Sequence, residues 1–257
     1  MSISDLFLGL DTVTVGGLPI ARLDIKQTAK LMVEAAIMNS PAEPPRYFTS
    51  ANGEVIARCR NDVKLRQLVC RAEIISADGQ SLVFASQLFT KRPLPERVAT
   101  TDLFDVVAAE ATRRGATFYL LGATEYANKG AYERTRYLFP NLKIIGRSHG
   151  YLDQERWPGK ICEINQLGPD ILWISQGVPL EQQFVARWAN NLTNVGVIKT
   201  SGGLFDFLSG AKRRAPIWMQ RAGLEWAYRV SLEPNRLFLR YAVTNPIAAL
   251  ELARSTH

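Results

Sequence analysis

Asp78 is the residue of this sequence best suited to acid–base chemistry, because it follows a predicted strand over residues 72–76 and precedes Gly79. A carboxylate at the end of a strand, beside a glycine that permits a tight turn, can act as a general base. The same pair also fits an ordinary Asp-Gly turn with no chemical role. His149 and His257 are the only two histidines. A histidine-rich zinc site therefore cannot be assembled, and catalysis by carboxylates is favoured.

Two further predicted strands are followed by glycines whose backbone amides could approach a phosphate or a ribose. Gly122 opens one of these turns, and close packing of a helix on a strand explains it equally well. Gly202 and Gly203, flanked by hydroxyls and followed by Asp206, end the last predicted strand and suit a diphosphate. Neither turn has the GxGxxG spacing of a dinucleotide-binding loop or the Walker pattern.

Polar side chains also stand at the beginning of two predicted helices. Ser50 and Asn52 lie between a strand and a helix, where they could bond a sugar or only cap the helix. Glu181 and Gln182 follow Gly177 and fall in the first turn of another helix. They could face a ligand there, and capping of the helix is the alternative interpretation.

Strands and helices alternate along most of the chain, which predicts an α/β fold with a mostly parallel, Rossmann-like sheet. In such sheets ligands bind beyond the carboxyl ends of the strands, which is where the residues above stand. The predicted strands cover residues 18–22, 46–50, 72–76, 117–121, 142–147, 171–175 and 195–200, and the predicted helices cover residues 26–38, 53–69, 101–114, 125–139, 156–166 and 181–190.

The character of the chain changes after about Phe207, where strands stop and short helical segments rich in Trp and Arg follow. A boundary near Leu208–Arg213 divides an α/β core, residues 1–207, from a small basic helical appendage, residues 208–257. The last 47 residues hold eight basic and three acidic residues, so +5 of the net charge of +7 lies there. Such a patch favours an anionic partner, which could be nucleic acid, acidic lipid or a diphosphate.

Composition bears on several classes of protein. No stretch approaches 18 uninterrupted apolar residues, so no transmembrane helix is expected, and the beginning of the chain lacks the basic region of a signal peptide. Three cysteines without CxxC spacing are expected to be free cytosolic thiols. The missing GxGxxG argues against a nucleotide-dependent oxidoreductase. A nucleic-acid-binding protein that uses the basic tail stays open as an alternative.

A series of short motifs resembles the WecG/TagA/CpsF glycosyltransferase family from about Leu18 to Tyr241. In order, the motifs are SANGE, ADG, PERV, LGAT, HGY, GVPLEQ, SGGLFD, RAPIW, GLEWAYR and EPNR followed by RY. The sequence departs from the family pattern at two places. Thr100 stands where the family has a glycine, and Glu181-Gln182 reverses the family's Gln-Glu order, and both departures bear on sugar specificity.

The resemblance implies an inverting glycosyltransferase that needs neither a metal nor a cofactor. Such enzymes move N-acetylmannosamine or a related hexose from a UDP-sugar to an undecaprenyl-diphosphate-linked saccharide, in the synthesis of teichoic acid linkage units and exopolysaccharides. The family's base falls on Asp78 and its T-x-N pair on Ser50 and Asn52, with Ser in place of Thr. Its other ligand-binding positions fall on Arg97, Gly177, Glu181, Gln182, Arg229, Arg236 and Arg240, and Arg214 in the RAPIW motif is a further candidate for substrate binding.

The resemblance also implies a place and partners for the protein. The arginines of the tail would meet the negative charge of the leaving UDP and of the acceptor diphosphate, together with the amides of Gly202 and Gly203. The expected location is the cytoplasmic, inner face of the cell membrane, with the tail on anionic lipid. A homo-oligomer is compatible with this expectation, and no nucleic acid is needed as a partner.

Overall fold

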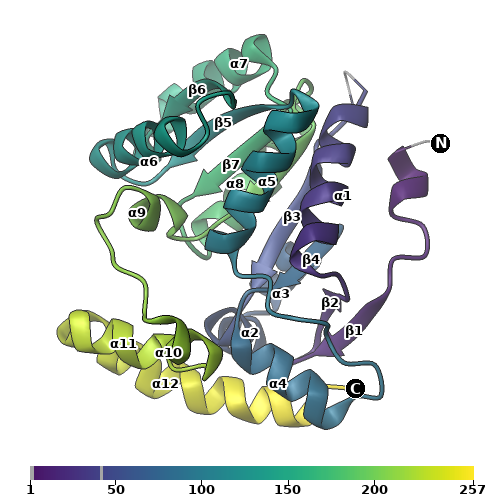
Figure 1. Cartoon of the computed structure of the whole chain (residues 1–257), viewed down its shortest axis with the longest axis vertical. Coiled ribbons are helices and arrows are strands. Elements are labelled where there is room, and N and C mark those ends of the chain that lie inside the picture. The colour runs from purple at the N-terminus through teal and green to yellow at the C-terminus, as the bar shows by residue number, and fades with distance from the viewer. Residues whose placement is uncertain (1–2, 41–42) are drawn as a thin grey trace.

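The centre of the computed structural model, which describes residues 3–40 and 43–257, is a six-stranded sheet with strand order β4-β3-β8-β7-β5-β6 (Figure 1). All neighbouring strands are parallel. Strands buried on both faces read as continuous apolar runs, and Ile171–Ser175 is buried at every position. The strands are β3 (Arg46–Ala51), β4 (Ile74–Ala77), β5 (Thr117–Gly122), β6 (Lys143–Ser148), β7 (Ile171–Ser175) and β8 (Val197–Thr200).

Helices cover both faces of this sheet, as the alternation of elements predicts. On one face α1 and α5 pack over Phe48, Phe118 and Trp173, and on the other α7 and α8 pack over Tyr119 and Leu172 (Figure 1). The helices of the core are α1 (Ile25–Met38), α2 (Gly53–Asn61), α3 (Val63–Val69), α4 (Gln80–Phe89), α5 (Thr100–Arg114), α6 (Glu125–Leu138), α7 (Trp157–Leu167), α8 (Leu180–Trp188) and α9 (Leu204–Leu208), with short 3₁₀ helices at Ile3–Leu6, Gln154–Arg156 and Ala189–Asn191.

The predicted parallel α/β fold is confirmed, and each strand of the sheet lies within a few residues of its predicted position. The single helix predicted over residues 53–69 is wrong. Asp62 ends α2 and begins α3, because its side chain accepts a hydrogen bond from the backbone N–H of Leu65 and so caps a new helix. Helix α4 had no counterpart in the sequence interpretation.

The strand predicted at residues 18–22 exists as β2 (Leu18–Ala21), but it lies outside the main sheet. It pairs antiparallel with β1 (Thr12–Val15) in a separate two-stranded sheet. Gly16 and Gly17, with φ of 56° and 75°, form the turn, which is the left-handed conformation that such tight hairpins require. The hairpin packs against α2 and α3 in a second apolar core.

The tail consists of α10 (Ile217–Arg221), α11 (Glu225–Leu232) and α12 (Pro234–Arg254), after an extended link that spans the predicted boundary. The expectation of short helical segments is wrong for α12, which has 21 residues and packs along α2 and α4 (Figure 1). Its end returns to the β1–β2 hairpin, where the N–H of Gly17 donates to the Ser255 carbonyl over 2.8 Å. Tail and core therefore share a packed surface as well as a covalent link.

Within residues 3–40 and 43–257, no helix combines the length and apolar character needed to cross a bilayer. The three cysteines are free thiols, as expected: Cys59 is buried, and Cys70 and Cys162 are exposed.

Candidate active site

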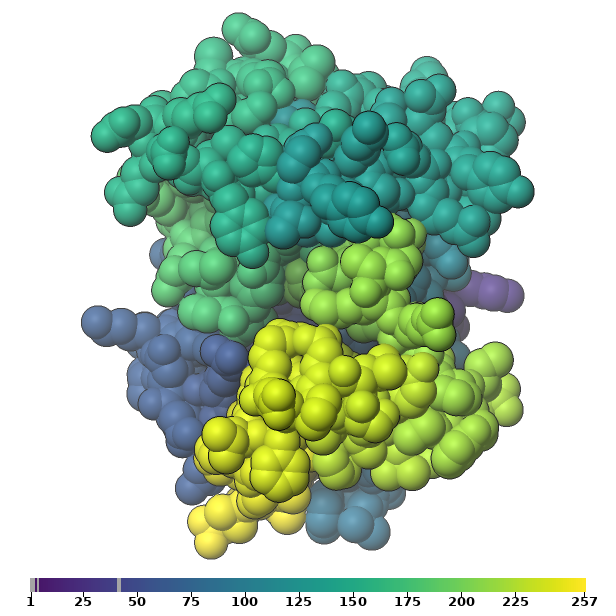
Figure 2. Space-filling view, turned by 90° about the vertical axis from the view of Figure 1, so that its left-hand side faces the viewer, coloured from purple at the N-terminus to yellow at the C-terminus, as the bar shows by residue number. Residues whose placement is uncertain are grey.

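A cavity of about 850 Å³ lies at the carboxyl ends of the strands, and all six strands of the sheet end at its wall. This is the size of a small-molecule or cofactor site. The residues that the strand ends contribute are Ser50, Asp78, Ala123, Gly150, Gln176 and Ser201. The tail forms the opposite wall with Gln220, Glu225, Trp226, Arg229, Arg236, Arg240 and Tyr241. Figure 2 shows the tail helices, in yellow and yellow-green, spread over one face of the molecule beside the core.

Asp78 stands one residue past β4, and its position is fixed by the neighbouring strand. Its backbone N–H donates to the Ala51 carbonyl at the end of β3 over 2.8 Å. The Thr100 backbone N–H and hydroxyl, at the start of α5, each lie 3.3 Å from one oxygen of its carboxylate. Burial raises the pKa of Asp78, whereas the positive charges of Arg97 and Lys199 oppose that rise. The group is thus a fixed carboxylate whose pKa is shifted toward neutrality, as a general base requires.

A row of ionisable side chains crosses the sheet beneath the cavity. Lys199, on the central strand β8, is fully buried, and its Nζ donates to Ser50 Oγ over 2.6 Å. Both Asp78 and Glu181 interact electrostatically with the Lys199 ammonium. Because Glu181 is also buried, with 3% of its surface exposed, desolvation raises its pKa.

The glycine-rich loop after β8 is held by the helix that follows β7. Glu181 Oε2 accepts a hydrogen bond from the Gly202 backbone N–H over 2.9 Å, and the Ser175 hydroxyl donates to the Gly202 carbonyl over 2.8 Å. Gly202 has φ of 60°, and a Cβ there would meet nothing within 4 Å. The loop therefore leaves room beside Gly202 for a phosphate to approach the backbone, while the Gly202 N–H itself is bonded to Glu181.

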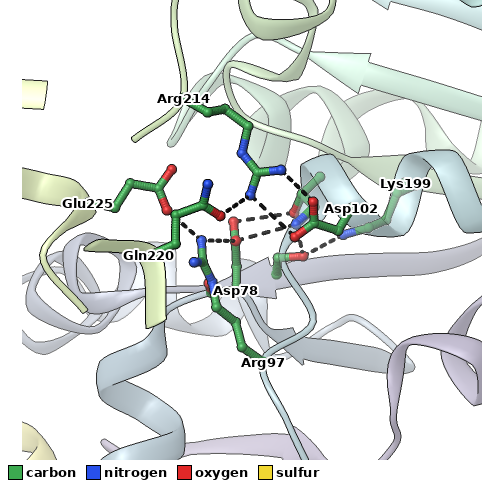
Figure 3. A network of polar contacts seen from close by, with 9 residues as sticks. Asp78, Arg97, Asp102, Lys199, Arg214, Gln220 and Glu225 are labelled. Carbon is green, nitrogen blue, oxygen red and sulfur yellow. Dashed lines mark hydrogen bonds and ion pairs between the residues drawn. The ribbon is translucent and has the colours of Figure 1, made fainter. Parts of the chain in front are cut away.

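Two arginines connect the tail to the neighbourhood of Asp78 (Figure 3). Arg97 donates from Nε to the Asp78 carbonyl over 2.5 Å and from Nη2 to Glu225 of α11 over 2.7 Å. Arg214 pairs with Asp102 of α5 and also donates to the Gln220 side-chain oxygen over 2.7 Å. The tail thus contributes one carboxylate, Glu225, and one guanidinium, Arg214, to the ion pairs next to Asp78.

The structure brings most of the predicted site residues together. Those that line the cavity are Ser50, Asn52, Asp78, Arg97, Gly177, Glu181, Gly202, Gly203, Asp206, Arg229, Arg236 and Arg240. Asn52 also caps α2, since its side-chain oxygen accepts from the Val55 N–H over 3.1 Å. The alternative interpretation of that residue as a helix cap therefore holds alongside its place in the cavity.

Three predicted residues lie behind this lining. Gly122, with φ of 125°, packs so closely on β7 that a Cβ would approach the Ser175 carbonyl oxygen to 2.3 Å, which is the close packing weighed as its alternative. Gln182 is buried and donates to Glu181 over 3.3 Å. Arg214 is held by Asp102 and Gln220 rather than extended into the cavity.

Sequence reasoning missed Lys199, Thr100 as a partner of Asp78, and Glu225 as a partner of Arg97. A signal existed for Lys199, because it is the one charged residue of the strand predicted over residues 195–200. The pairing of Arg97 with Glu225 had none, since 128 positions separate them. Among the described residues, no group of three or more His, Cys, Asp or Glu side chains is placed to hold a metal ion.

Comparison with known proteins identifies the family of the chain. The family model described as "Glycosyl transferase WecG/TagA/CpsF family" matches residues 13–257. The chain is 31% identical to the N-acetylglucosaminyldiphosphoundecaprenol N-acetyl-beta-D-mannosaminyltransferase of Bacillus subtilis (strain 168), over 74% of this chain and 72% of the relative. It is 27% identical to the enzyme of the same name from Staphylococcus aureus (strain MRSA252), over 74% of each chain. The chain therefore belongs to the WecG/TagA/CpsF family of glycosyl transferases, and it is a hexosyltransferase.

Proposed function

We propose that this protein transfers N-acetylmannosamine or a related hexose from a UDP-sugar to an undecaprenyl-diphosphate-linked saccharide, with inversion and without a metal. The names of the relatives, which act on an N-acetylglucosaminyl-diphosphoundecaprenol, support this class of donor sugar and acceptor in cell-wall polysaccharide synthesis. The observation that carries the proposal is the fixed carboxylate of Asp78 in a cavity whose opposite wall holds the cations of the tail.

The reaction divides between these two sides of the cavity. Asp78 takes the proton of the acceptor hydroxyl, whose oxygen bonds to the anomeric carbon on the face opposite UDP. The bond from that carbon to the phosphate oxygen breaks, and UDP leaves with the electron pair. The added negative charge is met by the backbone amide of Gly203 and by Arg229 and Arg236, which line the cavity, whereas the Gly202 amide would first have to leave Glu181.

The same tail fits a peripheral place on the inner face of the membrane. Ile217 and Trp218 are 68% and 65% exposed, and the exposed Arg213 and Arg221 lie close to them in the chain. Apolar and aromatic side chains among cations are typical of segments that lie on anionic lipid. These exposed residues support a lipid surface and a diphosphate as the partners of the basic tail, in preference to the nucleic acid that its charge would also fit.

The test of the base is Asp78→Asn, with Asp105→Asn as the matched control, since Asp105 is an exposed aspartate of α5. Transfer is measured by mass spectrometry of products from a panel of UDP-sugars and a soluble lipid-diphosphate analogue. Asp78→Asn should lower the rate about 10²–10⁴-fold, keep UDP affinity, and leave the anomeric configuration of residual product inverted. A wild-type rate in Asp78→Asn would reduce Asp78 to a turn residue.

The absence of a metal and the membrane contact are tested separately. Activity should survive EDTA, and loss that Mg²⁺ restores would contradict a metal-free reaction. Charge reversal at Arg213 and Arg221, which are exposed and do not line the cavity, should weaken binding to anionic vesicles, by about 1 kcal/mol for each cation near the surface, while transfer to the soluble analogue changes little. Equal vesicle binding by the variant and the wild type would contradict the membrane contact.

A further inference from the structure

Lys199 is a fully buried lysine, and burial of its charge opposes folding unless nearby groups stabilise the ammonium. Its surface is 0% exposed, and its strand neighbours Val197 and Ile198 are equally buried. A lysine without solvent is destabilising when charged unless acids and hydrogen-bond acceptors surround the ammonium. Burial accordingly lowers the pKa of Lys199 to about 8, against the opposing influence of Asp78 and Glu181. At neutral pH most molecules therefore still carry the charge.

The contacts of the ammonium are directional. Lys199 Nζ donates to Ser50 Oγ over 2.6 Å and to the Thr200 carbonyl over 3.1 Å. The Thr100 hydroxyl in turn lies 3.1 Å from Ser50 Oγ and 3.3 Å from Asp78 Oδ2. Four side chains from four separate segments thus form one chain of contacts that begins at a buried cation and ends at the candidate base (Figure 3).

Ser50 Oγ accepts hydrogen bonds from both of its neighbours in this chain, the Lys199 ammonium and the Thr100 hydroxyl. The Thr100 hydroxyl, which has a single hydrogen, is the donor toward both Ser50 Oγ and Asp78 Oδ2. Lys199 therefore fixes the Ser50 oxygen against which Thr100 is placed, and the Thr100 N–H and hydroxyl beside Asp78 favour its ionised form.

Other charges act on Asp78 beside that of Lys199, and the Arg97 guanidinium lowers the pKa of Asp78 more than the Lys199 ammonium does. Arg97 favours its ionised form, but Arg97 also pairs with Glu225 over 2.7 Å, and the Glu225 carboxylate opposes ionisation of Asp78. Arg214 interacts electrostatically with Asp78 while it is bonded to Asp102. Lys199 is the fully buried cation of the set, so its charge is the least screened by water.

We propose that Lys199 is a positioning residue: it fixes the Ser50 hydroxyl against which Thr100 is placed beside Asp78, and its charge holds the Asp78 carboxylate in the ionised form that accepts the acceptor's proton. This inference rests on the proposed role of Asp78 as the base. It assigns Lys199 no contact with substrate, because the side chain lies beneath the cavity floor.

The test compares Lys199→Met with Thr49→Val. Thr49, one residue before Ser50 on the same strand, shares a buried 2.7 Å hydroxyl contact with Thr200, so this control removes a buried hydrogen bond from the same two strands without changing charge. The titration of Asp78 is followed by carboxyl ¹³C NMR in the ligand-free protein, and kcat and KM are measured against pH.

Lys199→Met should raise the midpoint of Asp78 by about one pH unit. It should lower kcat about tenfold on the acid limb of the profile, with the KM for the UDP-sugar changed less than about twofold. Thr49→Val should leave both the midpoint and the limb in place. An unchanged Asp78 midpoint in a folded Lys199→Met protein would overturn the proposal.

The proposal can still be tested if Lys199→Met fails to fold or if Asp78 is not the base. If Lys199→Met does not fold, Thr100→Val interrupts the same chain of contacts with a side chain of equal shape and removes the hydroxyl that donates to Asp78, so the Asp78 midpoint should still rise; no rise would overturn the proposed chain. The NMR titration does not depend on transfer. If Asp78→Asn kept full activity while the midpoint still shifted with Lys199→Met, the base assignment would fail and the electrostatic coupling would stand.

Discussion

The ion pair between Arg97 and Glu225 should contribute to the free energy that holds the tail against the cavity. The two side chains meet over 2.7 Å with 17% and 22% of their surfaces exposed, Arg97 from the loop before α5 and Glu225 from the start of α11. Hydrogen bonds to charged groups in such partly buried places contribute about 1.5–3 kcal/mol. Arg97→Met, Glu225→Gln and the double variant should therefore show a coupling energy of about 2 kcal/mol.

Arg97→Met should destabilise the docked tail more than Glu225→Gln does. Arg97 also donates to the Asp78 carbonyl over 2.5 Å and lies 3.8 Å from the Asp78 carboxylate, so Arg97→Met loses contacts that Glu225→Gln keeps. A matched control is the pair Lys129–Glu133 on α6, which meets over 3.8 Å with 61% and 63% of the side chains exposed. Its coupling should stay below about 0.5 kcal/mol, because solvent screens exposed pairs.

The assay is amide hydrogen exchange in residues 217–232 of the full chain, which reports opening of α10 and α11 from the core. A coupling of about 2 kcal/mol corresponds to roughly thirtyfold in the opening equilibrium, at about 1.4 kcal/mol per factor of ten. If the effects of the two single variants add up to the effect of the double variant within about 0.5 kcal/mol, the coupling of tail and cavity through this pair is refuted.

Three other perturbations have expected outcomes. Gly122→Ala should destabilise the protein by more than about 3 kcal/mol in urea unfolding, because its Cβ would meet the backbone of β7, whereas Gly177→Ala, with nothing within 4 Å, should cost only the strain of φ 77°. Burial raises the pKa of Cys59 to about 12, so a thiol reagent at pH 8 should modify the two exposed cysteines of the folded protein and leave Cys59 intact. Glu225→Gln removes a negative charge that raises the pKa of Asp78, so the acid limb of kcat should move to lower pH; a shift to higher pH would contradict this sign.

The parallel sheet could be predicted because each of its strands is a short apolar run separated from the next by an amphipathic helix. Asp62 shows where that signal stops. The apolar period continues through residues 53–69, yet one carboxylate that bonds the Leu65 N–H divides the helix in two. The β1–β2 hairpin was missed for a similar reason, since four-residue strands around a Gly-Gly turn carry too little periodicity.

The candidate site could be predicted to the extent that parallel strands end on the same side. Asp78, Gly177 and Gly202 follow three different strands, and the topology alone brings them to one cavity. What these residues bond could not be predicted, because the partners come from distant segments. The sequence leaves Glu181 open between facing a ligand and capping a helix; the structure places it in the cavity wall, where it accepts a hydrogen bond from the Gly202 amide.

Charged side chains of both the core and the tail line the same cavity. Among the described residues, the basic side chains lining the cavity are Arg58, Arg97, Lys212, Arg229, Arg236 and Arg240, and the acidic ones are Glu54, Asp78, Glu181, Asp206 and Glu225. Most of these cations are already paired, for example Lys212 with Asp206 and Arg240 with Glu54.

A diphosphate therefore enters a cavity that is close to neutral, and it gains strong contacts only where a cation exchanges its protein carboxylate for a phosphate oxygen. Arg229, which lies 5.9 Å from the Phe207 ring centre in a cation–π contact, can turn to a phosphate without giving up a carboxylate. Four of the six lining cations, Lys212 among them, come from the tail. Whatever holds α10 and α11 in place, the Arg97–Glu225 pair included, therefore also sets how many positive charges a bound diphosphate can reach. By linkage, a bound diphosphate must in turn favour the docked tail.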